Sequence, residues 1–166
     1  MTITFRKLQE NDLEFICNVR NLYSEEFLHD SRKFTIQQTI SWFKETNPDF
    51  YAILVDGEIA GYFRLSNYSQ TNRNIYIGAD LHPYFCGKGI GYCAYKKFID
   101  YIFKKYSLHK ISLEVLKTNK RAISLYQKLG FITEGEKRDE VFKNGKFVDS
   151  IIMSMIINEK PSYEDC

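Results

Sequence analysis

The 166-residue sequence lacks the signals that mark several common classes of protein. Its four cysteines, at positions 17, 86, 93 and 166, form no C-x-x-C pair and have no histidines at zinc-site spacing, so we predict reduced thiols and no metal site. It holds only three prolines, no internal repeat and no low-complexity linker. This continuity favours one domain over residues 1–158, followed by a flexible tail over residues 159–166.

Neither sign of charge dominates, because 23 basic and 21 acidic residues leave a formal net charge of +2. Because the two signs are nearly balanced, the protein has no overall electrostatic field that would attract nucleic acid or an anionic membrane. Any anion must therefore be bound by local groups. No apolar run approaches the roughly 18 residues of a membrane span, and the N-terminal MTITFRKLQENDLEF has charges where a signal peptide needs apolar residues. We therefore expect a cytoplasmic protein without a membrane span or a nucleic-acid partner.

Hydrophobic periodicity predicts strands and helices in alternation. Two dipeptides, Asp56-Gly57 and Asn144-Gly145, favour tight hairpin turns because both tolerate positive φ. The pattern predicts strands over residues 3–8, 50–55, 58–67, 74–81, 109–116, 131–142 and 146–157, and helices around residues 13–19, 36–45, 90–102 and 121–131. This mixture is typical of an α/β fold.

The segment CGKGIG, residues 86–91, has the composition of a phosphate-binding loop. A Walker A loop is excluded because Gly89 follows Lys88, and a dinucleotide fingerprint is excluded because Tyr92 stands in place of its last glycine. What remains is a strand, a glycine turn and a helix N-terminus, whose unsatisfied N–H groups suit a pyrophosphate. A glycine-rich turn that merely begins a helix remains the alternative.

Four segments, in this order, resemble the GNAT acyltransferases: NIYIGADLHP, CGKGIGYCAYKKF, HKISLEVL and NKRAISLYQKLGF. The resemblance covers residues 1 to about 157, and the pattern N-x-x-A-x-x-L-Y-x-x-x-G-F is its most specific part. It implies an acetyl-CoA-dependent N-acetyltransferase. The implied fold is a mixed, mostly antiparallel sheet of about seven strands flanked by helices, with parallel strands 4 and 5 splayed around the cofactor.

The resemblance also implies which residues meet acetyl-CoA. Backbone N–H groups of the glycine loop would hold the pyrophosphate, those of residues 77–81 would polarise the thioester carbonyl, and Asn119 would bond the pantetheine arm. Cys86 departs from the family, which usually has Arg or Gln there. The implied cofactor-binding set is Ile77, Ala79, Leu81, Cys86, Gly87, Lys88, Gly89, Ile90, Gly91, Asn119 and Tyr126.

For catalysis, the resemblance assigns Tyr126 as the general acid that protonates the leaving CoA thiolate, while the amine attacks directly. The alternative is that Tyr126 only packs its helix on the sheet. The general base stays open among Asp80, His82 and Glu114. Each also has an ordinary structural role, as a turn cap, an exposed histidine or a carboxylate on a strand face.

The acceptor is expected from residues 20–42, because this family builds its acceptor pocket largely from the first two helices and their connection. The segment looks similar to enzymes that acetylate nucleotide-linked deoxyaminosugars. It offers Arg20, His29 and Arg32 for phosphate, and Tyr23, Phe27 and Trp42 as apolar faces for a ring. Protein α-amino groups, polyamines and a non-catalytic acyl-CoA-binding domain are the alternatives, and a homodimer is left open.

Overall fold

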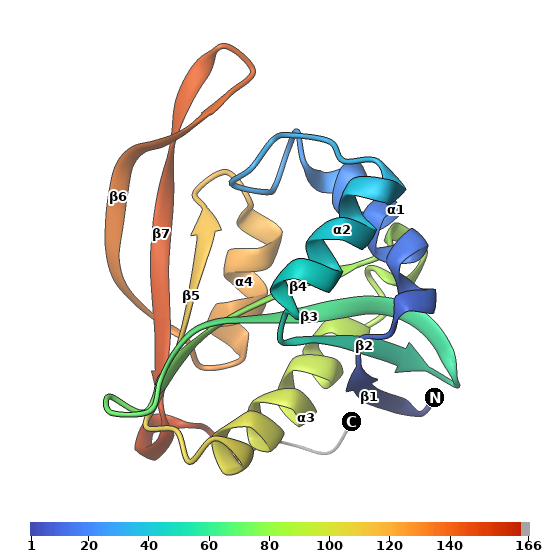
Figure 1. Ribbon diagram of the computed structural model, residues 1–166. Helices are drawn as coiled ribbons and strands as arrows, with labels where there is room; N and C mark the ends of the chain where they lie inside the picture. Colours follow the sequence, from blue (N-terminus) through green and yellow to red (C-terminus); the bar gives the residue numbers. More distant parts are fainter. Residues whose placement is uncertain (164–166) are drawn as a thin grey trace.

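The computed structural model describes residues 1–163, and residues 164–166 lie outside the described part (Figure 1). The strands are β1 (Ile3–Lys7), β2 (Phe50–Val55), β3 (Glu58–Ser69), β4 (Asn74–Leu81), β5 (Lys110–Leu116), β6 (Ile132–Lys143) and β7 (Lys146–Ile156). The helices are α1 (Leu13–Tyr23), α2 (Ile36–Thr46), α3 (Ile90–Lys105) and α4 (Lys120–Lys128), with short 3-10 turns η1 (Glu10–Asp12), η2 (Pro83–Phe85) and η3 (Ile157–Glu159).

Local sequence explains where many elements begin and end. Thr35 and Gln38 form a reciprocal capping box at the start of α2, and Asn47, in the left-handed conformation, ends that helix before Pro48. Both predicted hairpin turns have positive φ at their two central residues, 49° and 89° at Asp56-Gly57 and 51° and 78° at Asn144-Gly145. Short-range chemistry therefore fixes these boundaries.

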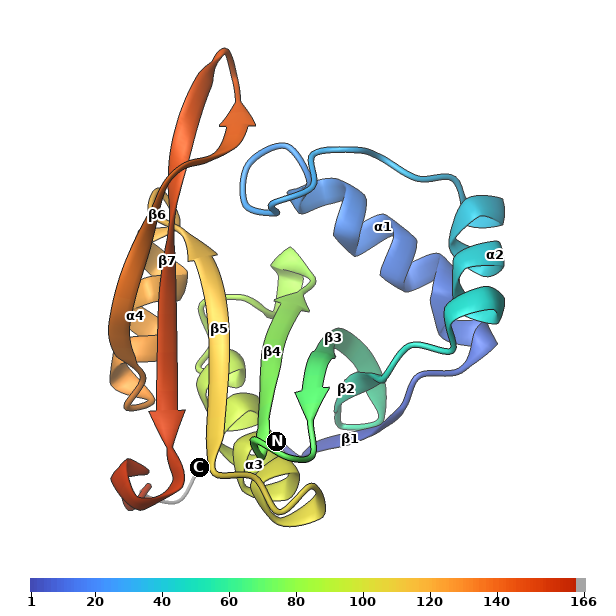
Figure 2. The same ribbon diagram turned by 60° about the vertical axis from the view of Figure 1, so that its left-hand side comes forward.

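The strands form one sheet in the order β1-β2-β3-β4-β5-β7-β6. Only β4 and β5 pair in parallel, and every other neighbouring pair is antiparallel. Helices α3 and α4 pack on one face around Phe98 and Tyr126, while α1 and α2 pack on the other against Ala52 and Tyr62 (Figure 2). The predicted seven-stranded mixed sheet flanked by helices is confirmed.

The parallel pair opens partway along its length. Pairing between β4 and β5 stops at Tyr76 and Ser112, although the strands continue to Leu81 and Leu116 (Figure 2). The predicted splay is therefore present. It leaves the facing backbone groups of both strands available for a ligand.

The backbone direction along β4 can be followed from its end. The His82 N–H donates to the Ala60 carbonyl at 2.8 Å, on the β3 side. Because successive residues of a strand direct their backbone groups to opposite sides, Ala79 and Leu81 direct theirs into the opening. The Tyr23 hydroxyl, which donates to the Leu81 carbonyl at 2.6 Å, agrees with this direction.

The described part of the C-terminal segment contacts the rest of the domain. Pro161 packs so closely on Gly130 that a Cβ on this glycine would lie 2.8 Å from the proline ring. The Tyr163 hydroxyl donates to the Leu129 carbonyl at 2.9 Å, and Lys160 pairs with Asp100. The described residues 159–163 therefore dock on α3 and α4, and the rest of the expected tail lies outside the described residues.

Two further expectations concern the cysteines and the membrane. Cys17 and Cys86 are free thiols, as predicted. The prediction is wrong for Cys93, which is disulfide-bonded, and Cys166 lies outside the described residues. Within residues 1–163, no helix is both long and apolar enough to cross a membrane.

Candidate active site

A cleft of about 670 Å³ lies at the end of β4, where Ala79, Asp80 and Leu81 line it. Tyr126 on α4 and the loop before α3 both line it, and it reaches the outer side of α4 at Lys128. Of the predicted cofactor-binding residues, the cleft is lined by Ala79, Leu81, Cys86, Gly87, Gly89, Gly91, Asn119 and Tyr126.

Three predicted cofactor-binding residues do not line the cleft. Ile77 and Ile90 are 4% and 2% exposed and belong to the hydrophobic core. The Lys88 ammonium instead lies 3.9 Å from the centre of the Tyr84 ring. For Ile77 and Ile90, only the backbone groups remain available for the predicted binding of the cofactor.

The glycine loop places a helix N-terminus at the cleft. Gly87 and Gly89 both have φ of +78°, a conformation that residues with a side chain rarely adopt. Gly89 is the N-cap of α3 and supplies no side-chain cap, so the first N–H groups of the helix keep their capacity to bind an anion. A Cβ on Gly89 would meet nothing within 4 Å, which shows open space beside the loop.

Tyr126 places a buried hydroxyl group at this cleft. Asn119 caps α4 by accepting from the Ala122 N–H at 3.2 Å, which fixes the start of the helix that carries Tyr126. Tyr126 is 8% exposed, and its hydroxyl oxygen lies 3.2 Å from that of Tyr95. Burial raises the pKa of Tyr126 above its usual value near 10, so the hydroxyl keeps its proton at neutral pH.

A second hollow, of about 300 Å³, joins the cleft between β4, β5 and the α1–α2 connection. Ala79, Asp80 and Tyr126 line both spaces, which makes them the junction. Here Arg64 Nη1 donates to Asp80 Oδ2 at 2.6 Å. Gly78 makes room for this pair, because a Cβ there would lie 2.9 Å from Arg64 Nη2.

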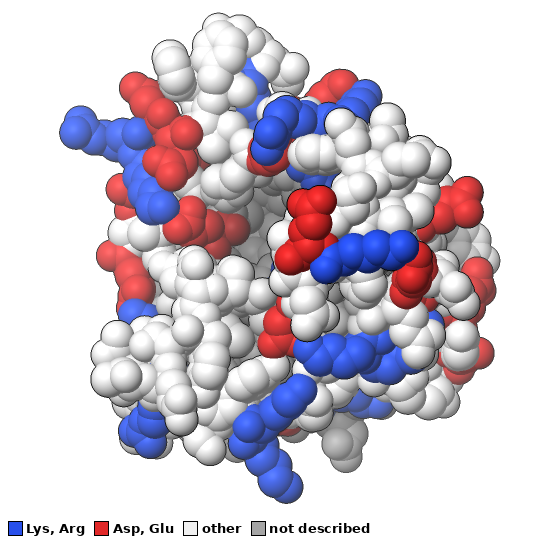
Figure 3. Space-filling view, viewed as in Figure 1, with Lys and Arg blue, Asp and Glu red and all other residues white. Residues whose placement is uncertain are grey.

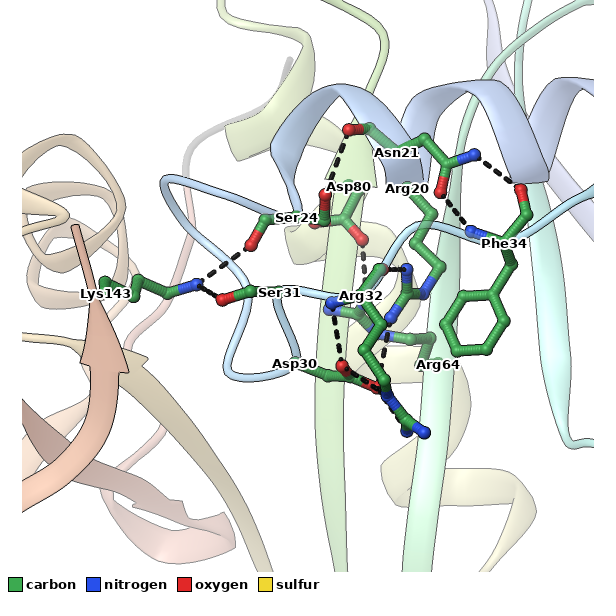
Figure 4. A network of polar contacts seen from close by, with 10 residues as sticks. All are labelled: Arg20, Asn21, Ser24, Asp30, Ser31, Arg32, Phe34, Arg64, Asp80 and Lys143. Carbon is green, nitrogen blue, oxygen red and sulfur yellow. Dashed lines mark hydrogen bonds and ion pairs between the residues drawn. The ribbon is translucent and has the colours of Figure 1, made fainter. Parts of the chain in front are cut away.

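A chain of polar contacts closes the hollow on the α1 side (Figure 4). Asp30 accepts from Arg32 at 2.8 Å and pairs with Arg20 at 3.3 Å. Lys143, near the end of β6, donates to the Ser24 carbonyl at 2.9 Å and to Ser31 Oγ at 2.7 Å. The α1–α2 connection is thereby tied to the β6–β7 hairpin.

His29 and Glu114 face one another across the hollow. His29 Nε2 lies 2.8 Å from Ser150 Oγ and 3.9 Å from Glu114 Oε2. Lys137 reaches the other oxygen, Glu114 Oε1, at 2.7 Å. Burial lowers the pKa of His29, so this ring is uncharged at neutral pH and does not act as a cation.

Several residues predicted for the acceptor or the base lie elsewhere. His82 Nδ1 accepts from the Tyr84 N–H at 3.3 Å and caps η2, while Trp42 packs on Phe50 with ring centres 5.2 Å apart. Neither residue lines the cleft or the hollow, and the same holds for Arg32, whose side chain is 77% exposed. Arg20, His29, Asp80 and Glu114 do meet in the hollow.

Two residues of the site were missed in the sequence. Arg64 interrupts the buried apolar run from Ile59 to Leu65 of β3, and a charge within such a run is the signal that could have identified it. Tyr95 gave no such signal, because an aromatic residue on the inner face of a helix looks like ordinary core. Within the described residues, no group of three or more histidine, cysteine or acidic side chains could hold a metal ion.

Comparison with known families identifies the family of this chain. The model of the acetyltransferase (GNAT) family matches residues 16–131, which is most of the chain. The chain belongs to this family. As a GNAT enzyme it is an N-acetyltransferase that uses acetyl-CoA.

The similar proteins include a relative named as a ribosomal N-acetyltransferase and others named as spermidine acetyltransferases. The chain is 30% identical over 169 residues, 95% of its own length and 92% of the relative, to the "Putative ribosomal N-acetyltransferase YdaF" of Bacillus subtilis (strain 168). It is 37% identical over 103 residues, 62% of this chain and 55% of that enzyme, to the spermidine N(1)-acetyltransferase of Escherichia coli (strain K12). These relatives are named as acetyltransferases, so the alternative of a non-catalytic acyl-CoA-binding domain has no support among them.

A solved structure agrees on the fold. The spermidine N-acetyltransferase of Vibrio cholerae, in complex with CoA and spermine, superposes with a TM-score of 0.86 at 24% identity. The match covers 95% of this chain and 96% of that one. At this identity the likeness establishes the GNAT architecture alone.

Proposed function

We propose that this N-acetyltransferase transfers acetyl to a primary amine of a linear polyamine of the spermidine class. The observation that carries the proposal is the hollow beside the cofactor cleft, on which three carboxylates converge from three segments: Asp30, Asp80 and Glu114. A protonated amine is a compact cation that carboxylate oxygens hold well. The names of the spermidine-acetylating relatives support the same acceptor class.

The charges of the hollow favour a cation over an anion. Two guanidinium groups, those of Arg20 and Arg64, stand against the three carboxylates, and His29 is uncharged at neutral pH. Each guanidinium already pairs with a carboxylate, Arg20 with Asp30 and Arg64 with Asp80. Figure 3 shows that both acidic and basic side chains border the central hollow of this face. Glu114 accepts from Lys137 through Oε1 at 2.7 Å, which leaves Oε2 as the carboxylate oxygen that a substrate ammonium can approach.

The nucleotide-linked aminosugar expected from the sequence has no support from the relatives. Its phosphates would need cations, yet Arg20 and Arg32 share Asp30 and His29 carries no charge at neutral pH. Of the three rings expected to stack on its base or sugar, Tyr23 and Phe27 line the cleft, whereas Trp42 packs on Phe50. We therefore replace this acceptor with a polyamine.

A protein N-terminus is the second candidate, because the similarity to the ribosomal-protein relative extends over 95% of the chain. The acceptors can be separated by comparing kcat/KM for spermidine, an N-terminal peptide and a nucleotide-linked 4-amino deoxysugar. We expect spermidine to exceed the other two by at least about tenfold, a difference of about 1.4 kcal/mol. A tenfold preference for the peptide would assign the enzyme to protein α-amines instead.

In the proposed reaction, the amine enters the hollow and attacks the acetyl carbonyl at the junction. Backbone N–H groups of Ala79 and Leu81 stabilise the carbonyl oxygen, and Tyr126 gives its proton to the departing thiolate. The proposed base is Glu114 through Oε2, since Lys137 holds its other oxygen, Oε1, at 2.7 Å. Asp80 is already engaged by Arg64 at 2.6 Å, and His82 lies outside the hollow.

Replacing Glu114 with Gln is expected to lower kcat/KM for spermidine by about 10²-fold or more, because the amide keeps the shape but can neither hold the ammonium nor accept its proton. The KM for acetyl-CoA should stay unchanged. A matched control is Glu134→Gln, since Glu134 also pairs with a lysine, Lys110 at 2.6 Å, but does not line the hollow. Equal activity of the two variants would place the base elsewhere.

A further inference from the structure

Two tyrosine hydroxyls meet at the wall of the cofactor cleft, one from α3 and one from α4. The oxygens of Tyr95 and Tyr126 lie 3.2 Å apart, and their rings meet edge to face with centres 5.5 Å apart. Both side chains are buried, at 3% and 8% exposure, and both line the cleft. The contact joins the proposed acid to a residue that has no assigned role.

The surroundings of Tyr95 account for its ring but not for its hydroxyl group. Its ring packs edge-on against Phe63, with centres 5.1 Å apart, and fixes the direction of the hydroxyl. Among residues 1–163, Tyr126 is the hydrogen-bond partner recorded for this hydroxyl. A phenylalanine at position 95 would fill the same core volume, so the buried hydroxyl calls for an explanation beyond packing.

The direction of the hydrogen bond decides whether Tyr126 can serve as an acid. If Tyr126 donated to Tyr95, its proton would point away from the leaving sulfur. If Tyr95 donates, the proton of Tyr126 stays free to point into the cleft. We propose that Tyr95 is a positioning residue, which donates to the Tyr126 oxygen and thereby directs the Tyr126 proton toward the CoA sulfur. This inference rests on the proposed role of Tyr126.

The same hydrogen bond stabilises the negative charge that forms on the Tyr126 oxygen during the reaction. When the C–S bond breaks, its electron pair leaves with sulfur, and Tyr126 transfers its proton to this thiolate to give CoA–SH. Tyr126 is then a buried phenolate, a state that burial makes costly. The Tyr95 O–H, which keeps its own proton, donates to this phenolate until Tyr126 regains a proton from water. The Arg64–Asp80 pair adds no net support, because the Asp80 charge opposes ionisation of Tyr126 at least as strongly as the Arg64 charge favours it.

The test is a double-mutant cycle with Tyr95→Phe, Tyr126→Phe and the double variant. Tyr95→Phe should lower kcat by about 10- to 100-fold, the range for a hydrogen bond to a charged group, with the KM for acetyl-CoA unchanged. In the Tyr126→Phe background the same substitution should have almost no effect on kcat, because it acts only through Tyr126. Tyr101→Phe, on the same helix and outside the cleft, is the control and should keep wild-type kcat.

The outcomes separate this inference from the proposed acid. If Tyr126→Phe lowers kcat but Tyr95→Phe does not, Tyr95 is a core residue and only the inference made here fails. Equal losses from Tyr95→Phe in both backgrounds would also overturn it, since a purely structural effect is independent of Tyr126. If Tyr126→Phe leaves kcat unchanged, the acid assignment itself fails. Thermal unfolding of each variant checks that the fold is retained.

Discussion

Tyr126→Phe is expected to lower kcat by about 10²- to 10⁴-fold, while the KM for acetyl-CoA stays close to that of the wild type. Among residues 1–163, Tyr126 carries the one hydroxyl group that lines both the cleft and the hollow, and the substitution removes it while keeping the ring that packs against Phe131. A loss confined to kcat is the mark of a contact made only in the transition state. Initial rates of thiol release at saturating acetyl-CoA and amine measure it.

The control for this prediction is Tyr92→Phe, because Tyr92 lines the same cleft but not the junction with the hollow. It should keep a kcat within a few-fold of the wild type. The pH dependence gives an independent check. Since burial raises the pKa of Tyr126 above 10, no loss of kcat from ionisation of Tyr126 is expected below about pH 10. A wild-type kcat in Tyr126→Phe would move the acid to another group.

Gly89→Val is expected to raise the KM for acetyl-CoA by about 10- to 100-fold, through loss of charged hydrogen bonds between the loop and the pyrophosphate. Gly89 holds a left-handed backbone with φ of +78°, and the space beside it is open to a ligand. A β-branched side chain would both strain this backbone and occupy that space. Titration of acetyl-CoA at saturating amine gives the KM, and kcat at saturation should change much less.

Backbone strain alone could mimic this result, so the control must carry the same strain. Gly57, in the β2–β3 turn, also has a left-handed backbone, with φ of +89° and no atom within 4 Å of an added Cβ. Gly57→Val should therefore lose a similar amount of stability and keep the wild-type KM. If both variants raise the KM equally, the glycine loop does not hold the cofactor in the way that we infer.

Much of the fold could be predicted because its determinants are local. The Asp56-Gly57 and Asn144-Gly145 turns require positive φ at both positions, and Thr35 caps a helix whose apolar residues repeat at helical spacing. The order of the strands is not local in this sense, and it was expected only through the family resemblance. The contacts of residues 159–163, such as that of Tyr163 with Leu129, join residues distant in the sequence, so no local pattern indicates them.

The candidate site also has a part that the sequence could indicate and a part that it could not. The glycine loop and Tyr126 lie in contiguous motifs, so the sequence could select them as candidates, and both line the cleft. The acceptor residues could not be selected from their types, because the path of the α1–α2 connection decides which side chains face the hollow. Arg32 turns outward to Asp30 and Trp42 lies against Phe50, whereas Arg64, from a strand far along the chain, lies in the hollow.

The central claim is that acetyl passes from acetyl-CoA to an amine of a polyamine, and one measurement tests it most directly. Wild-type protein is incubated with acetyl-CoA and spermidine, and free CoA thiol and acetylated spermidine are quantified in the same samples over time. We predict that both products accumulate at equal rates, one thiol for each acetylated amine, with little thiol released when spermidine is omitted. Thiol release that spermidine does not increase, or that yields no acetylated spermidine, would contradict the account.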